Sequence, residues 1–160
     1  MREHGFEFKF IHKNSEGEVL NDSGFLKNHM TDDGFEQMYD VYFRGAAAPA
    51  SFEIGLAQNS LGQDSSIGDV MEVTGEGYSA EGVSRDAAGL PSLGLDDGDI
   101  QVETATVQFE NTGESAWDSA VDGYLASDSE LVCYRPLSAT RTLQPGDTLD
   151  VTIRVKGLQP

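Results

Sequence analysis

The residues best suited to chemistry in this 160-residue sequence are one cysteine, three histidines and one short acidic run. Cys133 is the only thiol, so the chain cannot form an internal disulfide. It lies in an apolar, strand-like run, where a buried and inert thiol is the usual state. His4, His12 and His29 lie near the start of the chain, and none has a local catalytic signature. The sequence leaves open a pair between Cys133 and one of these histidines.

The acidic run contains Asp96, Asp97 and Asp99, and it resembles part of a calcium-binding loop. It lacks the alternating ligand spacing and the distal bidentate Glu of such a loop, so we predict no metal site and no cofactor. The sequence also lacks a phosphate-binding loop, a dinucleotide glycine pattern, a paired-histidine motif and a nucleophile elbow. Paired carboxylates arise by chance in so acidic a chain, and a small acidic hydrolase is therefore a disfavoured alternative. We predict that the protein is not an enzyme.

Trp117 is the only tryptophan, and it follows a short polar segment. An indole ring at the edge of a loop can stack on a sugar, or it can close the edge of a hydrophobic core. The sequence leaves both interpretations open.

Charge excludes several classes of partner. The chain has 28 acidic and 10 basic residues, which gives a net charge of −18. Nucleic acids and anionic membranes attract the opposite sign, so we expect neither as a partner. The sequence has no apolar stretch of about 20 residues and no secretory signal, which predicts a soluble protein. A Lys-poor, acidic surface is typical of proteins that work in concentrated salt, and we interpret the chain as halophilic.

Strand patterns dominate the second half of the chain. Residues 148–155 alternate strictly between apolar and polar side chains, and a Pro-Gly turn at residues 144–147 precedes them. The apolar phase slips near Glu103-Thr104, which predicts a bulge or two separate strands. Residues 90–95 are too rich in turn residues to predict a regular element. We predict an antiparallel β-sandwich or jelly-roll-like domain with one α-helix.

An N-terminal β-hairpin is predicted within residues 1–28, and we interpret it as an arm next to a compact unit at 29–160. Phe6, Phe8 and Phe10 lie on one face of this hairpin. A lone two-stranded ribbon cannot cover three such side chains. We therefore predict that they contact another copy of the chain across a symmetry axis.

The helix is predicted at about 31–44. Thr31 is a good N-cap, and Gly45 ends the helical pattern. The helix carries one apolar stripe, formed by Phe35, Met38, Tyr39, Tyr42 and Phe43. We interpret this stripe as the face that packs on the core.

Four segments also carry a resemblance to a known family. They are residues 27–35 at the helix entry, Gly77-Tyr78 with Val83, Trp117 with Val121, Tyr124 and Leu125, and residues 131–137 with 142–149. In this order they resemble structural proteins of tailed viruses, over most of residues 6–155. The family often has Arg in the Gly-Tyr strand, where this chain has Ala80-Glu81.

The resemblance implies a virion structural protein of the head-decoration, turret or tail-fibre kind, with no catalytic residues. Together with the acidity, it implies a virus of a halophilic archaeon, assembled in the host cytoplasm. The leading hypothesis is a capsid-surface protein that forms a trimer or pentamer on the major capsid protein or other neighbouring virion proteins. The alternative is a tail or fibre adhesin that binds host-surface glycan through Trp117 and nearby loops.

The charge generates a first prediction. Because 28 carboxylates repel one another around only 10 cations, the melting temperature should rise steeply between low salt and molar salt. Thermal unfolding in a series of sodium chloride concentrations measures this rise. A melting temperature independent of salt would contradict the halophilic interpretation.

Overall fold

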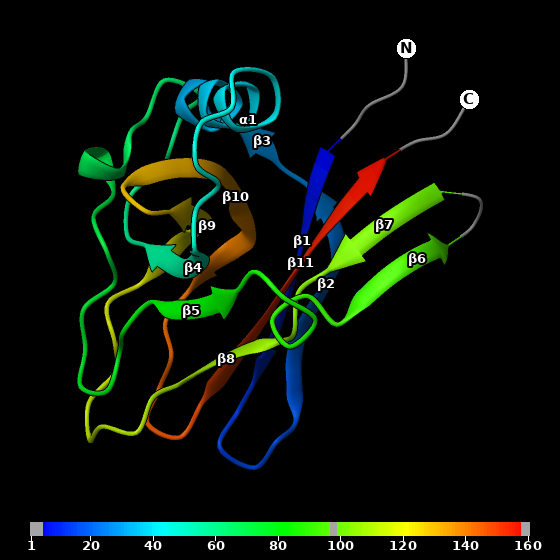
Figure 1. Ribbon diagram of the computed structural model, residues 1–160. Helices are drawn as coiled ribbons and strands as arrows, with labels where there is room; N and C mark the ends of the chain where they lie inside the picture. The colour runs from blue at the N-terminus through cyan, green and yellow to red at the C-terminus, as the bar shows by residue number, and fades with distance from the viewer. Residues whose placement is uncertain (1–4, 97–98, 158–160) are drawn as a thin grey trace.

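The computed structural model describes residues 5–96 and 99–157, which form two β-sheets, one α-helix and one short 3-10 helix (Figure 1). The first sheet contains β1 (Gly5–Lys13), β2 (Val19–Lys27), β6 (Ser92–Asp96), β7 (Asp99–Glu103), β8 (Val107–Glu110) and β11 (Thr148–Gly157). The second contains β3 (His29–Met30), β4 (Ser51–Ala57), β5 (Glu81–Ser84), β9 (Ala120–Ser127) and β10 (Glu130–Arg141). The helices are α1 (Asp32–Phe43) and η1 (Ile67–Asp69).

The predicted fold class is confirmed, because the molecule is mainly β with antiparallel strand pairs, two packed sheets and one α-helix. One hydrophobic core fills the space between the sheets. Its buried side chains include Phe8, Phe10, Ile54, Leu56, Phe109, Trp117, Leu149, Val151 and Ile153. Neither helix in the described part of the chain is long and apolar enough to cross a membrane.

Strand β11 is an inner strand of the first sheet. It pairs with β1 over nine residues, and on its other edge it pairs with β8 and then with β7. The predicted alternation is confirmed, since Leu149, Val151 and Ile153 are fully buried on the core face. On the opposite face Asp150 accepts hydrogen bonds from Lys13 and Gln108.

The phase slip near Glu103-Thr104 separates β7 from β8, as one of the two predicted alternatives required. Both strands pair with β11, and a short connection lies between them. Here the Thr104 N–H donates to the Ile153 carbonyl (2.8 Å), and the Ile153 N–H donates to Thr104 Oγ1 (3.0 Å). The side-chain hydroxyl thus replaces a backbone acceptor at the point where β11 changes partner. Beyond this point the hairpin β6–β7 projects from the sandwich (Figure 1).

The predicted N-terminal hairpin is present, but it is an integral part of the sandwich. Strand β1 lies between β2 and β11, and its ladder with β11 runs from Gly5–Lys156 to Lys13–Thr148. The sheet therefore includes both the predicted arm (residues 1–28) and the last strand of the predicted compact unit (29–160). The separation of an arm from that unit needs correction, because β1 supplies a central strand and two core phenylalanines.

The predicted helix is also present, with the predicted cap. Thr31 Oγ1 accepts a hydrogen bond from the Gly34 N–H (3.0 Å), and it also donates to the Leu131 carbonyl of β10. Gly45 follows the last turn with φ of +75°, which suits a glycine stop. At Gly34 the helix approaches β10 so closely that a Cβ atom would lie 2.1 Å from the Val132 carbonyl oxygen. Only glycine permits this contact.

A second prediction tests this close approach. In an exposed helix, Gly→Ala stabilises by about 1 kcal/mol. Gly34→Ala should instead lower the free energy of unfolding by roughly 1–3 kcal/mol, because the methyl group collides with the backbone of β10. Urea unfolding measures the change. Gly82→Ala is the control, since a Cβ at Gly82 meets nothing within 4 Å. Stabilisation by Gly34→Ala would show that α1 does not pack on β10 in this way.

Candidate functional site

The most unusual feature of the molecule is the direction of the aromatic stripe on α1. We predicted that this stripe packs on the core, and this is wrong. The stripe residues are exposed, from 40% for Phe35 to 80% for Tyr42. Their rings contact one another, with centroid separations of 6.2 Å for Phe35–Tyr39, 6.0 Å for Tyr39–Phe43 and 5.0 Å for Tyr42–Phe43. The helix therefore presents a continuous apolar ridge to solvent.

The opposite side of α1 explains this orientation. Gly34 is the buried residue of the helix, and Gln37 accepts a hydrogen bond from the Ser127 hydroxyl of β9. Val41, one turn after Gln37, is partly buried. The helix thus packs on the second sheet through small and polar residues, which allow a closer approach than aromatic rings would. The aromatic side chains are left on the outer face.

A second set of exposed apolar side chains lies on the projecting hairpin β6–β7. Leu93, Leu95 and Ile100 are 76%, 74% and 46% exposed. In the sheet, Leu95 pairs with Ile100, and Leu93 pairs with Val102. Paired residues share a face, so these four side chains form one apolar patch.

This patch continues the core face of the first sheet. Val102 pairs with Val155 of β11, and Val155 pairs with Phe6 of β1. Two residues further along β1, Phe8 pairs with Ile153 in the buried core. The same sheet face is therefore covered in the body of the sandwich and uncovered at β6–β7. Phe6, at the boundary, is partly buried and packs against the core.

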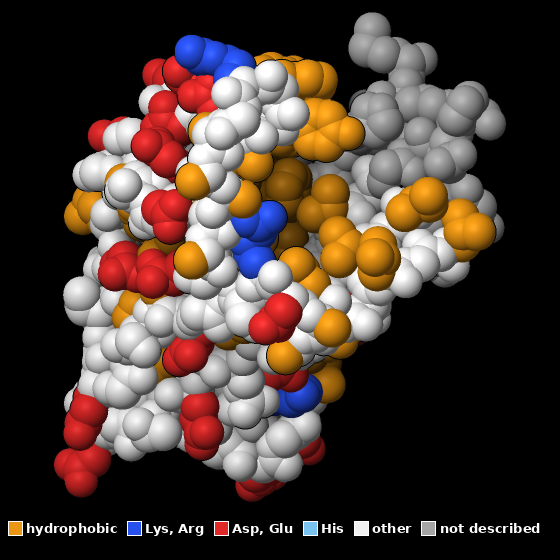
Figure 2. All heavy atoms as spheres, in the orientation of Figure 1, with side chains coloured by type: hydrophobic (Ala, Val, Ile, Leu, Met, Phe, Trp, Pro, Cys, Tyr) orange, Lys and Arg blue, Asp and Glu red, His pale blue; other side chains and the backbone are white. Residues whose placement is uncertain are grey.

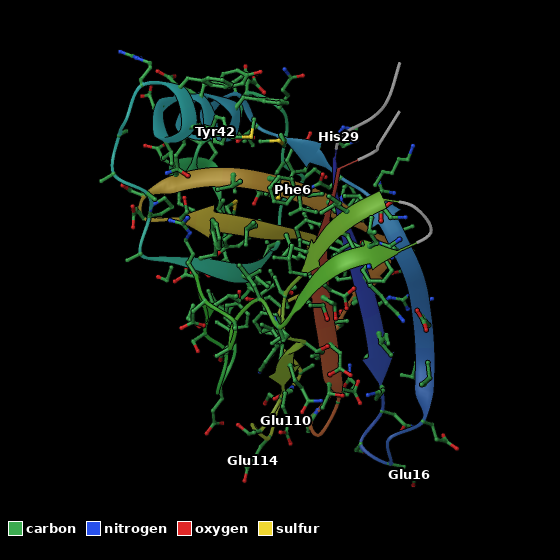
Figure 3. The ribbon with its side chains drawn as sticks, turned by 45° about the vertical axis from the view of Figure 1, so that its right-hand side comes forward. Phe6, Glu16, His29, Tyr42, Glu110 and Glu114 are labelled. Atoms are coloured by element: carbon green, nitrogen blue, oxygen red, sulfur yellow. The ribbon has the colours of Figure 1, made fainter. Side chains whose placement is uncertain are left out.

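The two sets of side chains flank a hollow. Figure 2 shows hydrophobic side chains on both sides of the space between α1 and β6–β7. Figure 3 shows Phe6 between these elements, below the helix that carries Tyr42. We define the apolar surface as the helix residues Phe35, Met38, Tyr39, Tyr42 and Phe43 together with the hairpin residues Leu93, Leu95 and Ile100. None of these residues carries a charge.

Phe6, Phe8 and Phe10 do not lie as the predicted subunit contact requires. Phe8 and Phe10 are 0% and 2% exposed, and their rings stack at 5.8 Å inside the sandwich. The chain's own second sheet covers them. The argument for a trimer or pentamer depended on their exposure, and it no longer applies.

Trp117 closes the core, which was one of its two predicted roles. Its side chain is 3% exposed, its Nε1 donates to the Glu76 carbonyl (2.9 Å), and its ring meets the Tyr78 ring edge-on at 5.3 Å. Gly75 lies against the indole, because a Cβ there would be 2.1 Å from Trp117. A sugar cannot stack on a ring buried in this way.

The titratable side chains are committed to the fold. Burial raises the pKa of the Cys133 thiol well above its usual value, so Cys133 is not a thiolate nucleophile at neutral pH. His12 Nε2 lies 3.1 Å from Asp147 Oδ2 in a buried pair that joins β1 to the turn before β11. The His29 ring contacts the Tyr134 ring at 5.7 Å. His4 lies outside the described residues.

Buried Tyr124 and partly buried Tyr78 both have their hydroxyl groups next to Glu72. The Tyr124 hydroxyl donates to Glu72 Oε1 (2.7 Å), and the Tyr78 hydroxyl accepts from the Leu56 N–H (2.8 Å). Burial raises the pKa of both tyrosines far above the neutral range. They remain protonated and act as hydrogen-bonding groups that join β4 and β9 to the loop before β5.

The predicted metal candidates cannot be placed. Asp97 lies outside the described residues, and so do the side chains of Asp96 and Asp99. Within residues 5–96 and 99–157, His, Cys, Asp and Glu form no group of three or more that could hold a metal ion.

Comparisons with known proteins give no relative from which a site could be transferred. The chain matches no protein-family model, and it matches no curated protein in sequence. The choice of the apolar surface as the candidate site therefore depends only on the geometry of this structure. The sequence did contain a signal for the hairpin part of this surface. Leu93 and Leu95 occupy alternate positions before the acidic run, and Ile100 and Val102 occupy alternate positions after it.

A third prediction asks whether the stripe contributes to folding. Tyr42→Ser and Phe43→Ser remove exposed rings, so each should change the free energy of unfolding by only about 0.5 kcal/mol. Phe8→Ala should lower the free energy of unfolding by about 3–5 kcal/mol, because it leaves a cavity in the buried core. Urea unfolding compares the three variants. If the stripe variants lowered the free energy of unfolding as much as Phe8→Ala, the stripe would have to pack within the folded chain.

Proposed function

We propose that this protein is a non-enzymatic structural component of a virus particle, and that it binds neighbouring protein subunits through the apolar surface. The proposal depends on one observation: a chain with a net charge of −18 exposes the eight apolar residues of the apolar surface, which flank one hollow. Contiguous exposed apolar patches mark interaction sites, since leaving them in water is unfavourable.

The composition of the apolar surface favours a protein partner. Aromatic residues and Met are enriched at the centres of protein interfaces, and the stripe consists of two Phe, two Tyr and one Met. Tyr supplies apolar area together with a hydroxyl that can bind at an interface rim. A small-molecule pocket would instead enclose its ligand, whereas this surface is a broad hollow between two elements (Figure 2).

The viral part of the proposal is supported by the order of the family-like motifs. Each of these motifs has a structural role here. Thr31 caps α1, and the Tyr78 hydroxyl accepts a hydrogen bond from the Leu56 N–H. Trp117 closes the core, and Gly146 has φ of +84° in the turn before β11. The resemblance therefore concerns residues that direct the chain into this fold, in the order in which the fold uses them.

A position on the capsid surface is favoured over a fibre adhesin. The adhesin hypothesis depended on Trp117 as a sugar-stacking residue, and this ring is buried. The hydrolase alternative relies on pairs of Asp or Glu side chains, which arise by chance in a chain with 28 acidic residues. Assembly through an apolar surface requires neither.

A fourth prediction tests assembly on the particle. Particles are purified from cultures that produce the protein, and labelled antibody locates it on their surface. The double variant Tyr42→Ser, Phe43→Ser should remain folded. The number of its copies on each particle should fall at least tenfold, because its contact surface is less apolar.

The matched control is Val19→Ser, Leu20→Ser, which removes two similarly exposed apolar side chains at the start of β2, outside the apolar surface. This variant should incorporate normally. Normal incorporation of the stripe variant, or absence of the protein from purified particles, would refute the proposed function.

A further inference from the structure

We propose that two copies of this chain pair antiparallel along β6, so that the first sheet continues from one copy into the other across a two-fold axis at Gly94. The partner is a second copy of the chain, bound next to the apolar surface. The inference rests on the proposed function because that function uses the same surface. Five observations support it: the free edge of β6, the irregularity or shortness of the other edge strands, the space at Gly94, the register and the side on which the apolar residues lie.

Strand β6 is the last strand of the first sheet. In the described part of the chain it is hydrogen-bonded to β7 on one side only. Alternate residues of such a strand direct backbone N–H and C=O groups away from the sheet. Proteins usually block such an edge with Lys, Pro, a bulge or a very short strand. Strand β6 has the sequence Ser-Leu-Gly-Leu-Asp, without Lys or Pro, and its ladder with β7 runs unshifted over five residues.

The edge strands β2, β3 and β5 are irregular or short, and β8, which pairs only with β11, has four residues. The ladder of β2 with β1 has two register shifts, and β2 ends in Lys27, whose carbonyl accepts a hydrogen bond from Arg135. At the edges of the second sheet, β3 has two residues and β5 has four. Strand β6 thus differs from β2 in its unshifted ladder and from β3, β5 and β8 in its greater length of five residues.

Gly94, at the centre of β6, packs against no other part of the described residues 5–96 and 99–157. A Cβ at this position would meet nothing within 4 Å, and its φ is not in the left-handed region. Glycine weakens a strand, and an unexplained glycine there often marks the close approach of another backbone. A second β6 strand supplies such a backbone.

The register of the β6 pairing determines which side chains of the two copies lie opposite each other. Antiparallel pairing centred on Gly94 is the register that pairs all five residues of β6 with the second copy. It places Leu93 opposite Leu95 of the second copy, and Ser92 opposite Asp96. No acidic residue then faces another, which matters for two chains that each carry a net charge of −18. Cross-strand Leu–Leu pairs add apolar contact.

The two-fold axis at Gly94 is perpendicular to the sheet, so both copies present the same sheet face on the same side. The exposed patch of Leu93, Leu95 and Ile100 therefore joins the same patch of the second copy. The aromatic stripes of the two α1 helices then flank one continuous apolar floor. The pairing doubles the width of the surface that the proposed function uses.

The first test introduces a cysteine at the axis. Opposed Cα atoms in an antiparallel pair lie about 4.5–5.5 Å apart, within the range of a disulfide. Gly94→Cys should form a covalent dimer under oxidising conditions in molar salt, detected by mass spectrometry and by electrophoresis without reductant. The native thiol is buried and does not compete. Gly82→Cys is the control, because it lies on edge strand β5 and has equally open space.

The second test changes only the charge pairing. Leu93→Lys with Leu95→Lys places like charges opposite each other twice in the dimer. Leu93→Glu with Leu95→Lys removes the same apolar side chains but places opposite charges there. Analytical sedimentation measures the dissociation constant of each dimer. The dissociation constant of the second variant should be about tenfold lower than that of the first.

Two results would overturn the inference: equal cross-linking of Gly94→Cys and Gly82→Cys, or equal dimerisation of the two charge variants. These failures are distinct from failure of the proposed function. Stripe-dependent incorporation into particles without cross-linking at Gly94 would leave the function intact and refute the pairing. Cross-linking at Gly94 in a protein absent from particles would support the pairing and refute the function.

Discussion

The hydrogen-bonded ladder along both edges of β11 is the constraint on which the first sheet depends. Strand β1 occupies one edge over nine residues, and β8 and β7 share the other. Leu149, Val151 and Ile153 direct the core face of β11 toward the second sheet. Strands β1 and β11 are far apart in the sequence, and both contribute buried residues to the same core. Loss of either strand therefore removes the central part of the sheet.

The change of partner along β11 also produces the apolar surface. At Thr104 the chain passes from β7 to β8, and the Thr104 hydroxyl accepts the Ile153 N–H in place of a carbonyl. Strand β8 lies within the sandwich, whereas β7 continues with β6 beyond the second sheet. The alternation of β11 continues to Val155, so the apolar face extends with it. The uncovered patch is thus a continuation of the core without its second layer.

Local patterns in the sequence predict the elements well, and long-range packing less well. The alternation at 148–155, the Thr31 cap and the slip near Thr104 each depend on neighbouring residues, and each is found as expected. The periodicity of α1 shows which side chains share a face, but not which face meets the sheet. That choice is made by Gly34 against Val132, a contact between residues distant in sequence. The burial of Phe8 likewise depends on a distant segment, because its ring lies against Gly123 of β9 in the second sheet.

The acidity and the apolar surface are physically consistent with one another. At molar salt the Debye length is about 3 Å, so carboxylates away from a contact hardly oppose it. Association then depends on the charge within the contact itself. The residues of the apolar surface carry none, although acidic residues lie beside them in the sequence of α1 (Asp32, Asp33, Glu36, Asp40) and of the hairpin (Asp96, Asp97, Asp99). At low salt the same carboxylates repel across any interface. The proposed assembly through the aromatic face should therefore strengthen over the same range of salt that is predicted to stabilise the fold.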